Sequence, residues 1–385
     1  MTQATPDYSL YFGSLNKLGV FPYNYQERTM TATVLKTGKK FHHFNILTAI
    51  LILSKQLYLI LLSLSTFRIE GPRPDLMFRL MWLLGSLFLT SMFLVHILFP
   101  KEVARFISAF VRIERNILAS TPAWTSKRHG KMFKDFLYCY FGMWVGGQVF
   151  MGALYIWNPK FFPFIYSNLE CFLMEGNLGR NWILEAFLFV TVGLFEVNFM
   201  GLAMANMAGF DILIGFASLS IKACLEELEK IGRDEFITGN NFFRHYKILE
   251  ILTKLMNEAF SLVLLAHFVV VFMMLPFFIY GLKHYAVSAA TTLFFVWCCL
   301  FQVVRVASIW IPMAFVQKQS GITLGNLKSL SCLKANQNGA SGLIKRQLKS
   351  CQPLAFSSGG LYCISVKSVL KYIYFATTYI VIFIG

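Results

Sequence analysis

The sequence predicts an all-α membrane protein with seven transmembrane helices. Three observations indicate this class: 56% of the 385 residues are hydrophobic, only 14% are charged, and the apolar residues gather in seven long windows. A soluble domain of this composition would leave far too much apolar surface in water. A helix of about 20 residues is long enough to cross the hydrocarbon core of a bilayer, so each window is a candidate span.

The candidate spans follow one another along the whole chain. They are Phe44–Phe67, Leu80–Phe99, Phe136–Trp157, Trp182–Asn206, Glu258–Gly281, Tyr285–Ile311 and Val366–Ile384. Residues 1–43 show no basic start followed by an apolar run, so no signal peptide is expected. The first span is therefore expected to act as its own insertion signal.

The distribution of positive charge predicts the orientation of these spans. Of the 35 Lys and Arg residues, 25 lie in the N-terminal segment and in the second, fourth and sixth loops, whereas six lie in the other loops. Cytosolic loops carry the excess of Lys and Arg, which places the N-terminus in the cytosol and, after seven crossings, the C-terminus outside the cell. This orientation is the reverse of that of a G-protein-coupled receptor.

The predicted orientation divides the chain into six segments. They are a cytosolic N-terminal segment (1–43), the first four spans (44–206) with an outer loop (158–180), a cytosolic helical projection (207–257), the fifth and sixth spans (258–311), a second cytosolic segment (312–363), and the last span (364–385). The apolar patch Leu18–Tyr25 is expected to lie against the bundle or the membrane surface. The outer loop is expected to cover an outward-facing pocket.

The cytosolic projection contains two stretches with helical periodicity, Phe210–Ile231 and Arg244–Phe260, and each carries its charges on one face. Long membrane helices are therefore expected to continue into the cytosol as an anchor region where subunits meet. Periodicity alone fits two solvated extensions without a partner equally well. Pro276 and Pro312 are expected to kink or end their helices.

The last span differs from the others because polar groups recur along it at helical spacing. Ser368, Lys371, Thr377, Thr378 and Tyr379 interrupt its apolar run. A helix surrounded by lipid does not tolerate so many polar positions without partners or water. We therefore expect one face of this helix to contact water, with several copies, one from each subunit, lining an ion pathway.

Aromatic side chains gather in the outer halves of the spans and are expected to line a pocket for a small organic ligand. These residues are Trp82, Phe150, Tyr155, Phe187, Phe294 and Trp297. Plain packing or an aromatic belt at the membrane interface is the alternative interpretation.

Two charged residues, Lys55 and Glu196, are expected near the middle of the membrane. An unpaired charge is costly there, so we expect either a direct ion pair between them or a water-filled cavity. Arg305 lies only seven residues from the inner end of its span, and its side chain is expected to extend to the cytosolic interface without a functional role.

Other classes of function find no support in the residues. The net charge of +16 forms no basic stripe interleaved with aromatic residues, so nucleic-acid binding is not expected. The eight cysteines show neither disulfide nor metal-ligand spacing, and no metal or cofactor is expected. No phosphate-binding loop, HExxH helix or nucleophile elbow is present, so the chain is not expected to be an enzyme.

Several motifs resemble those of insect gustatory and odorant receptors. The gustatory signature has Thr and Tyr followed by five apolar residues, Gln and Phe; here Thr378 and Tyr379 precede Ile380–Ile384, and Gly385 replaces Gln. Cys351–Leu370 looks like the segment that precedes the last helix in both groups, and Leu18–Asn24 looks like the family's opening.

The resemblance implies a ligand-gated, nonselective cation channel in the plasma membrane, assembled as a homotetramer or as a heterotetramer with a co-receptor subunit. The last helices would surround a central pore, and a tastant or odorant would bind in the outer half of each subunit, with taste favoured by the Thr378 and Tyr379 match. Matched residue by residue, Val381, Ile384 and Gly385 would lie near an apolar gate, with Thr377 and Thr378 one turn deeper. Four copies of Lys371 would repel cations unless they face away from the path.

Two other functions remain open from the sequence. A G-protein-coupled receptor has seven helices but needs the opposite orientation. A transporter is expected to show inverted repeats or broken helices in matching halves, and the sequence shows no such symmetry.

Overall fold

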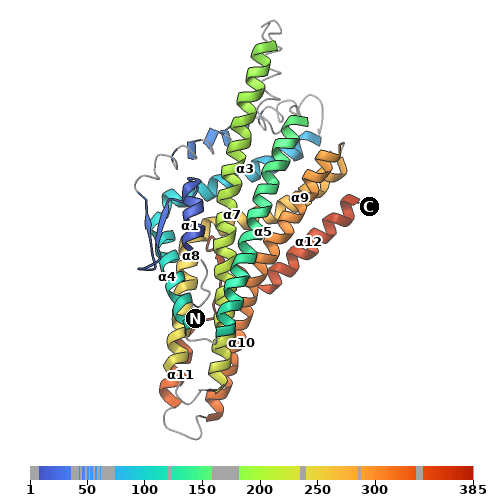
Figure 1. Ribbon diagram of the computed structural model, residues 1–385. Coiled ribbons are helices and arrows are strands. Elements are labelled where there is room, and N and C mark those ends of the chain that lie inside the picture. The colour runs from blue at the N-terminus through green and yellow to red at the C-terminus, as the bar shows by residue number, and fades with distance from the viewer. Residues whose placement is uncertain are drawn as a thin grey trace.

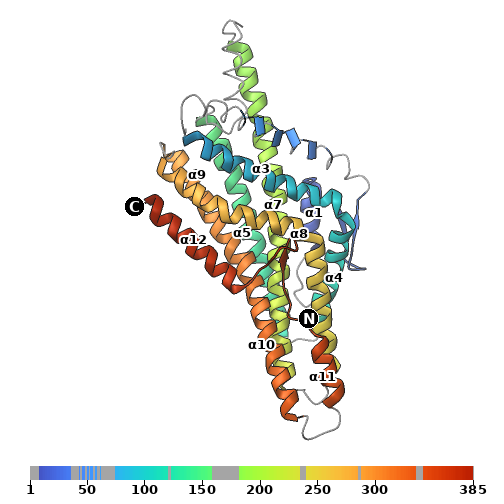
Figure 2. The ribbon, with the colours of Figure 1, turned by 180° about the vertical axis from the view of Figure 1, so that it is seen from behind.

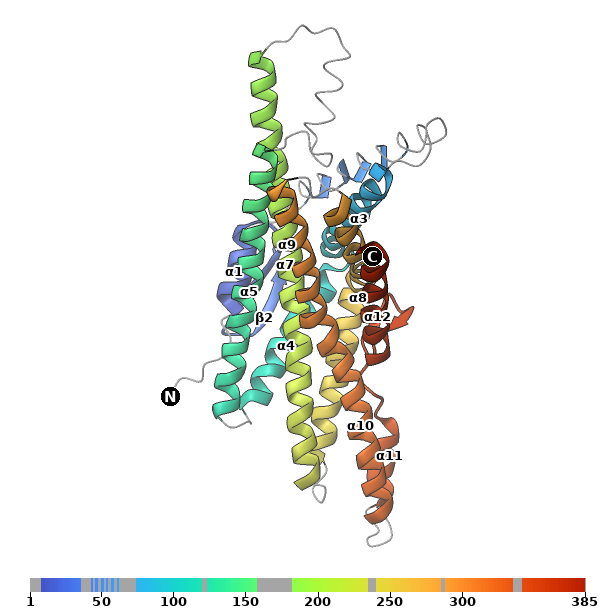
Figure 3. The same ribbon diagram turned by 90° about the vertical axis from the view of Figure 1, so that its right-hand side faces the viewer.

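The computed structural model describes residues 8–35, 74–119, 123–157, 182–234, 240–284, 288–334 and 341–384, together with scattered residues between 43 and 61. Long helices run side by side and form an elongated bundle (Figure 1). Helix α7 (Trp182–Asp234) reaches beyond its neighbours at one end, and α10 (Ile311–Lys334) and α11 (Ser341–Ser350) lie at the other (Figure 3). The predicted all-α membrane class is confirmed.

The remaining elements follow the chain order. The helices are α1 (Tyr8–Lys17), α3 (Pro74–Leu98), α4 (Pro100–Ala119), α5 (Ala123–Trp157), α8 (Asn240–His284), α9 (Ala289–Arg305) and α12 (Val366–Ile384). A π-helical turn, η1 (Val306–Trp310), joins α9 to α10. Two antiparallel hairpins pair β1 (Tyr23–Gln26) with β2 (Thr31–Val34) and β3 (Ser357–Ser358) with β4 (Tyr362–Cys363).

Among the described residues, four helical stretches are long and apolar enough to cross a membrane, and α3 with α4, which meet at 85°, would add a fifth. The four are Gly130–Trp157, Gly201–Glu229, Phe242–His284 and Thr291–Ser329. The predicted first span and the outer loop at 158–180 lie largely or wholly outside the described residues. The orientation of the two termini stays a prediction.

The N-terminal segment packs against the bundle. Its buried aromatic side chains are Tyr8, Tyr11, Phe12, Phe21, Tyr23 and Tyr25. The Tyr8 hydroxyl donates to the buried carboxylate of Glu114 in α4, and Ser220 in α7 donates to the same group at 3.1 Å. Burial and the Glu114 carboxylate both raise the pKa of Tyr8, so this hydroxyl stays protonated and able to donate. The patch Leu18–Tyr25 thus lies against the bundle, partly as a β-strand that the sequence pattern did not reveal.

The helix that contains the sixth predicted span does not end at Pro312, although an end there was one of the two outcomes expected for that residue. The helix passes through η1 and continues to Lys334. Pro312 has no N–H to donate to the Ser308 carbonyl four residues earlier, so an α-helical turn could not make that bond. The chain instead forms a π turn, in which the Ile311 N–H donates to the Val306 carbonyl. Helix α8 likewise continues past Pro276 to His284.

Candidate functional site

Helix α12 packs mainly against α8 and α10, and this contact buries one side of it. Val369, Tyr372 and Ala376 recur at helical spacing on the buried side. The opposite side presents a stripe of exposed residues at intervals of three and four, which we call the α12 stripe: Leu370, Tyr374, Thr377 and Val381. Figures 1 and 2 show that the C-terminal half of α12 diverges from the rest of the bundle. The stripe therefore faces away from its own subunit.

Three of the predicted pore residues lie on or beside this stripe. Thr377 and Val381 belong to it, and Thr378 lies at its edge, half-buried. The hydroxyls of Thr377 and Thr378 donate to the carbonyls of Ile373 and Tyr374, one turn earlier. Ile384 belongs to α12, but its side chain and Gly385 lie outside the described part of the chain.

Lys371 is exposed but does not belong to the α12 stripe. Successive residues of an α-helix are rotated by about 100°, which places Lys371 roughly 90° from the centre of the stripe. Its ammonium group therefore points to one side of the stripe and not along it.

The predicted ligand residues fall into separate groups. The ring centroids of Phe150 in α5 and Trp297 in α9 lie 6.4 Å apart. Tyr155 is instead packed against α7, where its ring stacks on Phe189 at 5.1 Å and its hydroxyl donates to the Phe189 carbonyl at 2.8 Å.

The other three ligand candidates differ in their surroundings. Phe294 is buried and contacts Phe295, whereas 63% of the Phe187 side chain is exposed. Trp82 lies in α3 with its side chain outside the described part of the chain. The structure thus brings Phe150 and Trp297 together, and it places Phe187 on the outside of the subunit.

A buried ion pair exists at positions that the sequence did not indicate. Arg305 in α9 and Asp211 in α7 are almost wholly buried, and Arg305 Nε lies 2.8 Å from Asp211 Oδ2. Arg305 Nη2 also donates to Asp211 Oδ1 at 3.3 Å. The expectation that Arg305 extends to the cytosolic interface is wrong, because a buried partner compensates its charge within the bundle. Lys55 and the Glu196 side chain, the expected pair, lie outside the described residues.

Aromatic rings and a histidine surround this ion pair. The Arg305 guanidinium lies 4.7 Å from the ring centroid of Phe88 and 5.4 Å from that of Phe301. His267 in α8 places Nε2 3.6 Å from Asp211 Oδ1, and Trp310 donates to His267 Nδ1 at 2.8 Å. The cluster therefore joins α3, α7, α8, α9 and η1.

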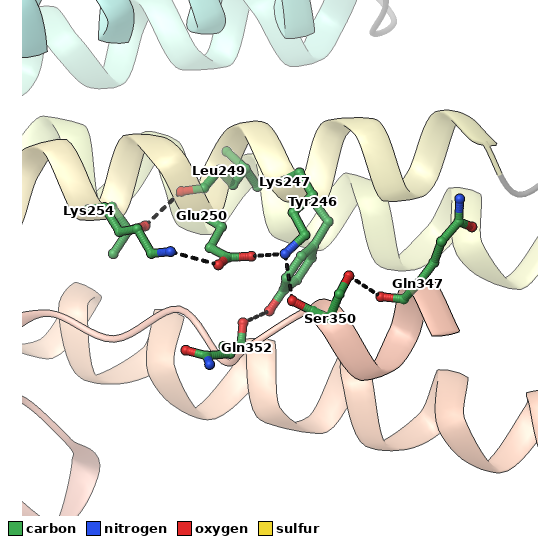
Figure 4. A network of polar contacts seen from close by, with 9 residues as sticks. Tyr246, Lys247, Leu249, Glu250, Lys254, Gln347, Ser350 and Gln352 are labelled. Carbon is green, nitrogen blue, oxygen red and sulfur yellow. Dashed lines mark hydrogen bonds and ion pairs between the residues drawn. The ribbon is translucent and has the colours of Figure 1, made fainter. Parts of the chain in front are cut away.

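An extended segment, residues 351–365, connects α11 to α12, and α8 holds it through hydrogen bonds to its backbone (Figure 4). The Tyr246 hydroxyl donates to the Gln352 carbonyl at 2.9 Å. Lys247 donates to the Ser350 carbonyl, just before the segment, at 2.6 Å, and also contacts Glu250.

Burial acts to raise the pKa of Glu250, but hydrogen bonds from Lys247 and Lys254 outweigh this effect and hold the pKa below its ordinary value. Glu250 therefore stays charged and holds Lys247 in position.

Asn257 is the residue of α8 that fixes this segment most directly. Its Nδ2 donates to the Ala355 carbonyl at 2.9 Å, and its Oδ1 accepts from the Ser357 N–H at 3.0 Å. A single asparagine in an amphipathic helix gives no sequence signal for such a role.

Replacing Asn257 by alanine is expected to destabilise the protein by about 2 kcal/mol, because two backbone groups lose their partner at once. Asn198→Ala is the matched control, since the Asn198 amide is exposed and, among the described residues, donates to the Leu194 carbonyl of its own helix alone. Thermal unfolding of the detergent-solubilised protein measures both. Equal melting temperatures for the two variants would contradict the assignment.

Taken together, these features define a multi-pass helical membrane protein whose last helix has one face that the described part of its own subunit leaves uncovered. The model of the 7tm chemosensory receptor family matches residues 8–384. The chain belongs to this family. Comparison with curated protein sequences gives no match.

Solved structures support the same fold. The insect olfactory receptor OR5 from Machilis hrabei superposes with a TM-score of 0.70 at 11% identity, and the match covers 98% of each chain. The same receptor in complex with eugenol superposes with a TM-score of 0.67 at 11% identity, and the match covers 98% of this chain and 99% of that one. Receptors of this family are not enzymes, and the sequence led to the same expectation because it contains no catalytic motif.

Proposed function

We propose that this chemosensory receptor is a ligand-gated, nonselective cation channel of the plasma membrane, in which α12 of four subunits surrounds the pore. The α12 stripe is the observation that carries the proposal. It is an apolar face, with Thr377 within it, that neither α8 nor α10 covers. Four such faces around one axis would enclose a narrow path, with the subunits supplying the contacts that each stripe lacks within its own chain.

In this arrangement Val381 and Ile384, one turn apart, form an apolar ring that closes the pore by excluding water. Lys371 points between neighbouring subunits, away from the axis, so that its charge does not repel cations in the path. Residues 207–257 and 312–363 project into the cytosol, where they provide the main subunit contacts. The N-terminus is then cytosolic and the C-terminus extracellular.

The ligand is a small organic molecule, an odorant or a tastant. Phe150 and Trp297 offer two neighbouring aromatic faces in the half of the bundle away from α11. Trp82, Tyr155, Phe187 and Phe294 shape the surroundings of that site. Eugenol, which the solved olfactory receptor binds in its complex, is the first compound to test.

Cysteine accessibility tests the pore assignment. With Val381→Cys, a charged membrane-impermeant thiol reagent added outside is expected to block most of the ligand-evoked current, because Val381 is 65% exposed on the stripe. Val369→Cys is the matched control on the buried side of the same helix. Both are made in a chain with Cys139→Ser and Cys363→Ser, since these two cysteines are themselves exposed. Unchanged current with Val381→Cys, or equal block with Val369→Cys, would reject α12 as the pore helix.

A further inference from the structure

The π turn η1 determines which side chains share a face where α9 joins α10. In a π turn, residues five positions apart lie close to one face, whereas in an α-helix residues five apart diverge by about 140°. Arg305 and Trp310 flank and end the turn, five positions apart. The π turn therefore brings both side chains to the same side of the helix.

On that side, two neighbouring helices bind the two residues. Arg305 pairs with Asp211 of α7, and Trp310 donates to His267 of α8. Because the indole N–H occupies His267 Nδ1, the imidazole proton lies on Nε2, which faces the same Asp211 carboxylate.

A third helix contacts the turn itself. The hydroxyls of Tyr140 in α5 and Ser308 in η1 lie 2.6 Å apart. Helix α7 also approaches the turn closely, since a Cβ added at Gly215 would lie 3.0 Å from the Ser308 carbonyl oxygen. Thus α5, α7 and α8 all hold the turn in its present register.

The turn lies between the ligand candidates and the segment that leads into α12. On one side, Arg305 contacts Phe301, whose ring stacks on Trp297 at 5.5 Å with the two planes 5° apart. On the other side, Trp310 stacks on Phe268 at 5.2 Å, and Phe268 contacts Tyr362 of β4 at 4.8 Å. A displacement of Trp297 therefore reaches Arg305 through a single intervening ring.

We propose that η1 is a two-state element that couples the ligand side of the receptor to α12; this inference rests on the proposed function. In one state the turn is π-helical and Arg305 and Trp310 keep both partners. In the other it is α-helical, α9 is rotated relative to α10, and one of the two contacts is broken. A ligand that moves Trp297 displaces Phe301 and the guanidinium stacked on it, and so favours the rotated state. The turn changes its helical register in one step, so a small displacement of Trp297 produces a larger rotation of α9 relative to α10.

Three substitutions and one deletion test whether η1 converts between two states or is simply packed in one. Trp310→Phe and Tyr140→Phe keep an aromatic ring and each remove one hydrogen bond that holds the turn. Deleting Ala307, an exposed residue of the turn, leaves Arg305 and Trp310 four positions apart in a continuous α-helix, so both partners are kept and no conversion remains. Ala307→Ser is the matched control that preserves the chain length.

Spin labels report the rotation without depending on channel activity. Labels are placed at Leu300 in α9 and Ile322 in α10, both exposed, in the full-length chain with its native cysteines replaced and reconstituted in lipid nanodiscs. The parent and Ala307→Ser are expected to show one main distance between labels. Trp310→Phe and Tyr140→Phe are each expected to increase a second distance population about fivefold, as the loss of one hydrogen bond predicts.

The deletion variant is expected to show a single distance, with or without Trp310→Phe. The proposal is overturned if both phenylalanine variants match the parent, or if the second population persists in the deletion background. If the deletion variant does not fold, the two phenylalanine variants decide the question alone.

Unliganded current, recorded for the same variants, separates this proposal from the channel assignment. If the distances change as expected in the two phenylalanine variants but their unliganded current does not rise above that of the parent, the channel is rejected and the two-state turn is kept. Currents in a protein whose distances never change would reject the two-state turn and keep the channel.

Discussion

Arg305→Met is expected to destabilise the folded protein by about 3–5 kcal/mol, because it leaves the Asp211 carboxylate buried without a counter-charge. The Asp211 side chain has no exposed surface, and the Arg305 side chain is 1% exposed. Methionine keeps much of the volume beside Phe88 and Phe301, so the main loss is the charge. Thermal unfolding in detergent, followed by size-exclusion chromatography after heating, measures the effect.

Two comparisons make this result specific. The double variant Arg305→Met with Asp211→Asn is expected to recover most of the lost stability, because no buried charge remains. Arg115→Met is the control for an exposed pair: Arg115 bonds Glu27 at 2.8 Å, but the Glu27 side chain is 56% exposed, and the loss is expected to stay below about 1 kcal/mol. An Arg305→Met protein as stable as Arg115→Met would show that the buried pair contributes nothing to the fold.

Gly147→Ala is expected to be the second most damaging of these substitutions. A Cβ at Gly147 would lie 2.6 Å from Trp297 Cη2 and 2.8 Å from Cζ2, closer than real Cβ atoms approach other heavy atoms. The Trp297 ring cannot yield freely, since it stacks on Phe301. We expect a loss of stability of about 1–3 kcal/mol and, because Trp297 moves, a change of about tenfold in the half-activating concentration of any compound that contacts it.

Gly142→Ala is the matched control for this prediction. Gly142 lies in the same helix, five residues earlier, and an added Cβ would meet no atom of the described residues within 4 Å. There the gain in helix propensity is expected to leave the protein unchanged or slightly more stable. If the two alanine variants behave alike in unfolding and in activation, the contact between Gly147 and Trp297 is not a constraint on the site.

Much of the long-helix arrangement could be predicted from the sequence. The stretches Phe210–Ile231 and Arg244–Phe260 indeed continue membrane helices, as α7 and α8 show. Apolar periodicity reports which side of a helix is buried, so it identified helices reliably. It also identified α12 as the helix with a polar component, and the structure exposes Thr377 and Val381 on one face.

Other parts of the site depend on contacts in the folded protein that leave no pattern in the sequence. The turn at η1 depends on Pro312 together with contacts from three other helices, and a proline alone indicates only a break. The role of Asn257 depends on a backbone segment about 100 positions further along the chain. The bond from the Tyr155 hydroxyl to the Phe189 carbonyl of α7 likewise joins two helices whose proximity helical periodicity does not reveal.

By itself the sequence determined that this protein is helical and lies in a membrane, and where its helices run, because the free energy of burying apolar surface accumulates residue by residue along the chain. Only the tertiary structure decided which charges are paired. Asp211 and Arg305 are 94 positions apart, and each is tolerable in the bundle only because the other lies against it. That compensation depends on distance in space, which helical periodicity does not encode.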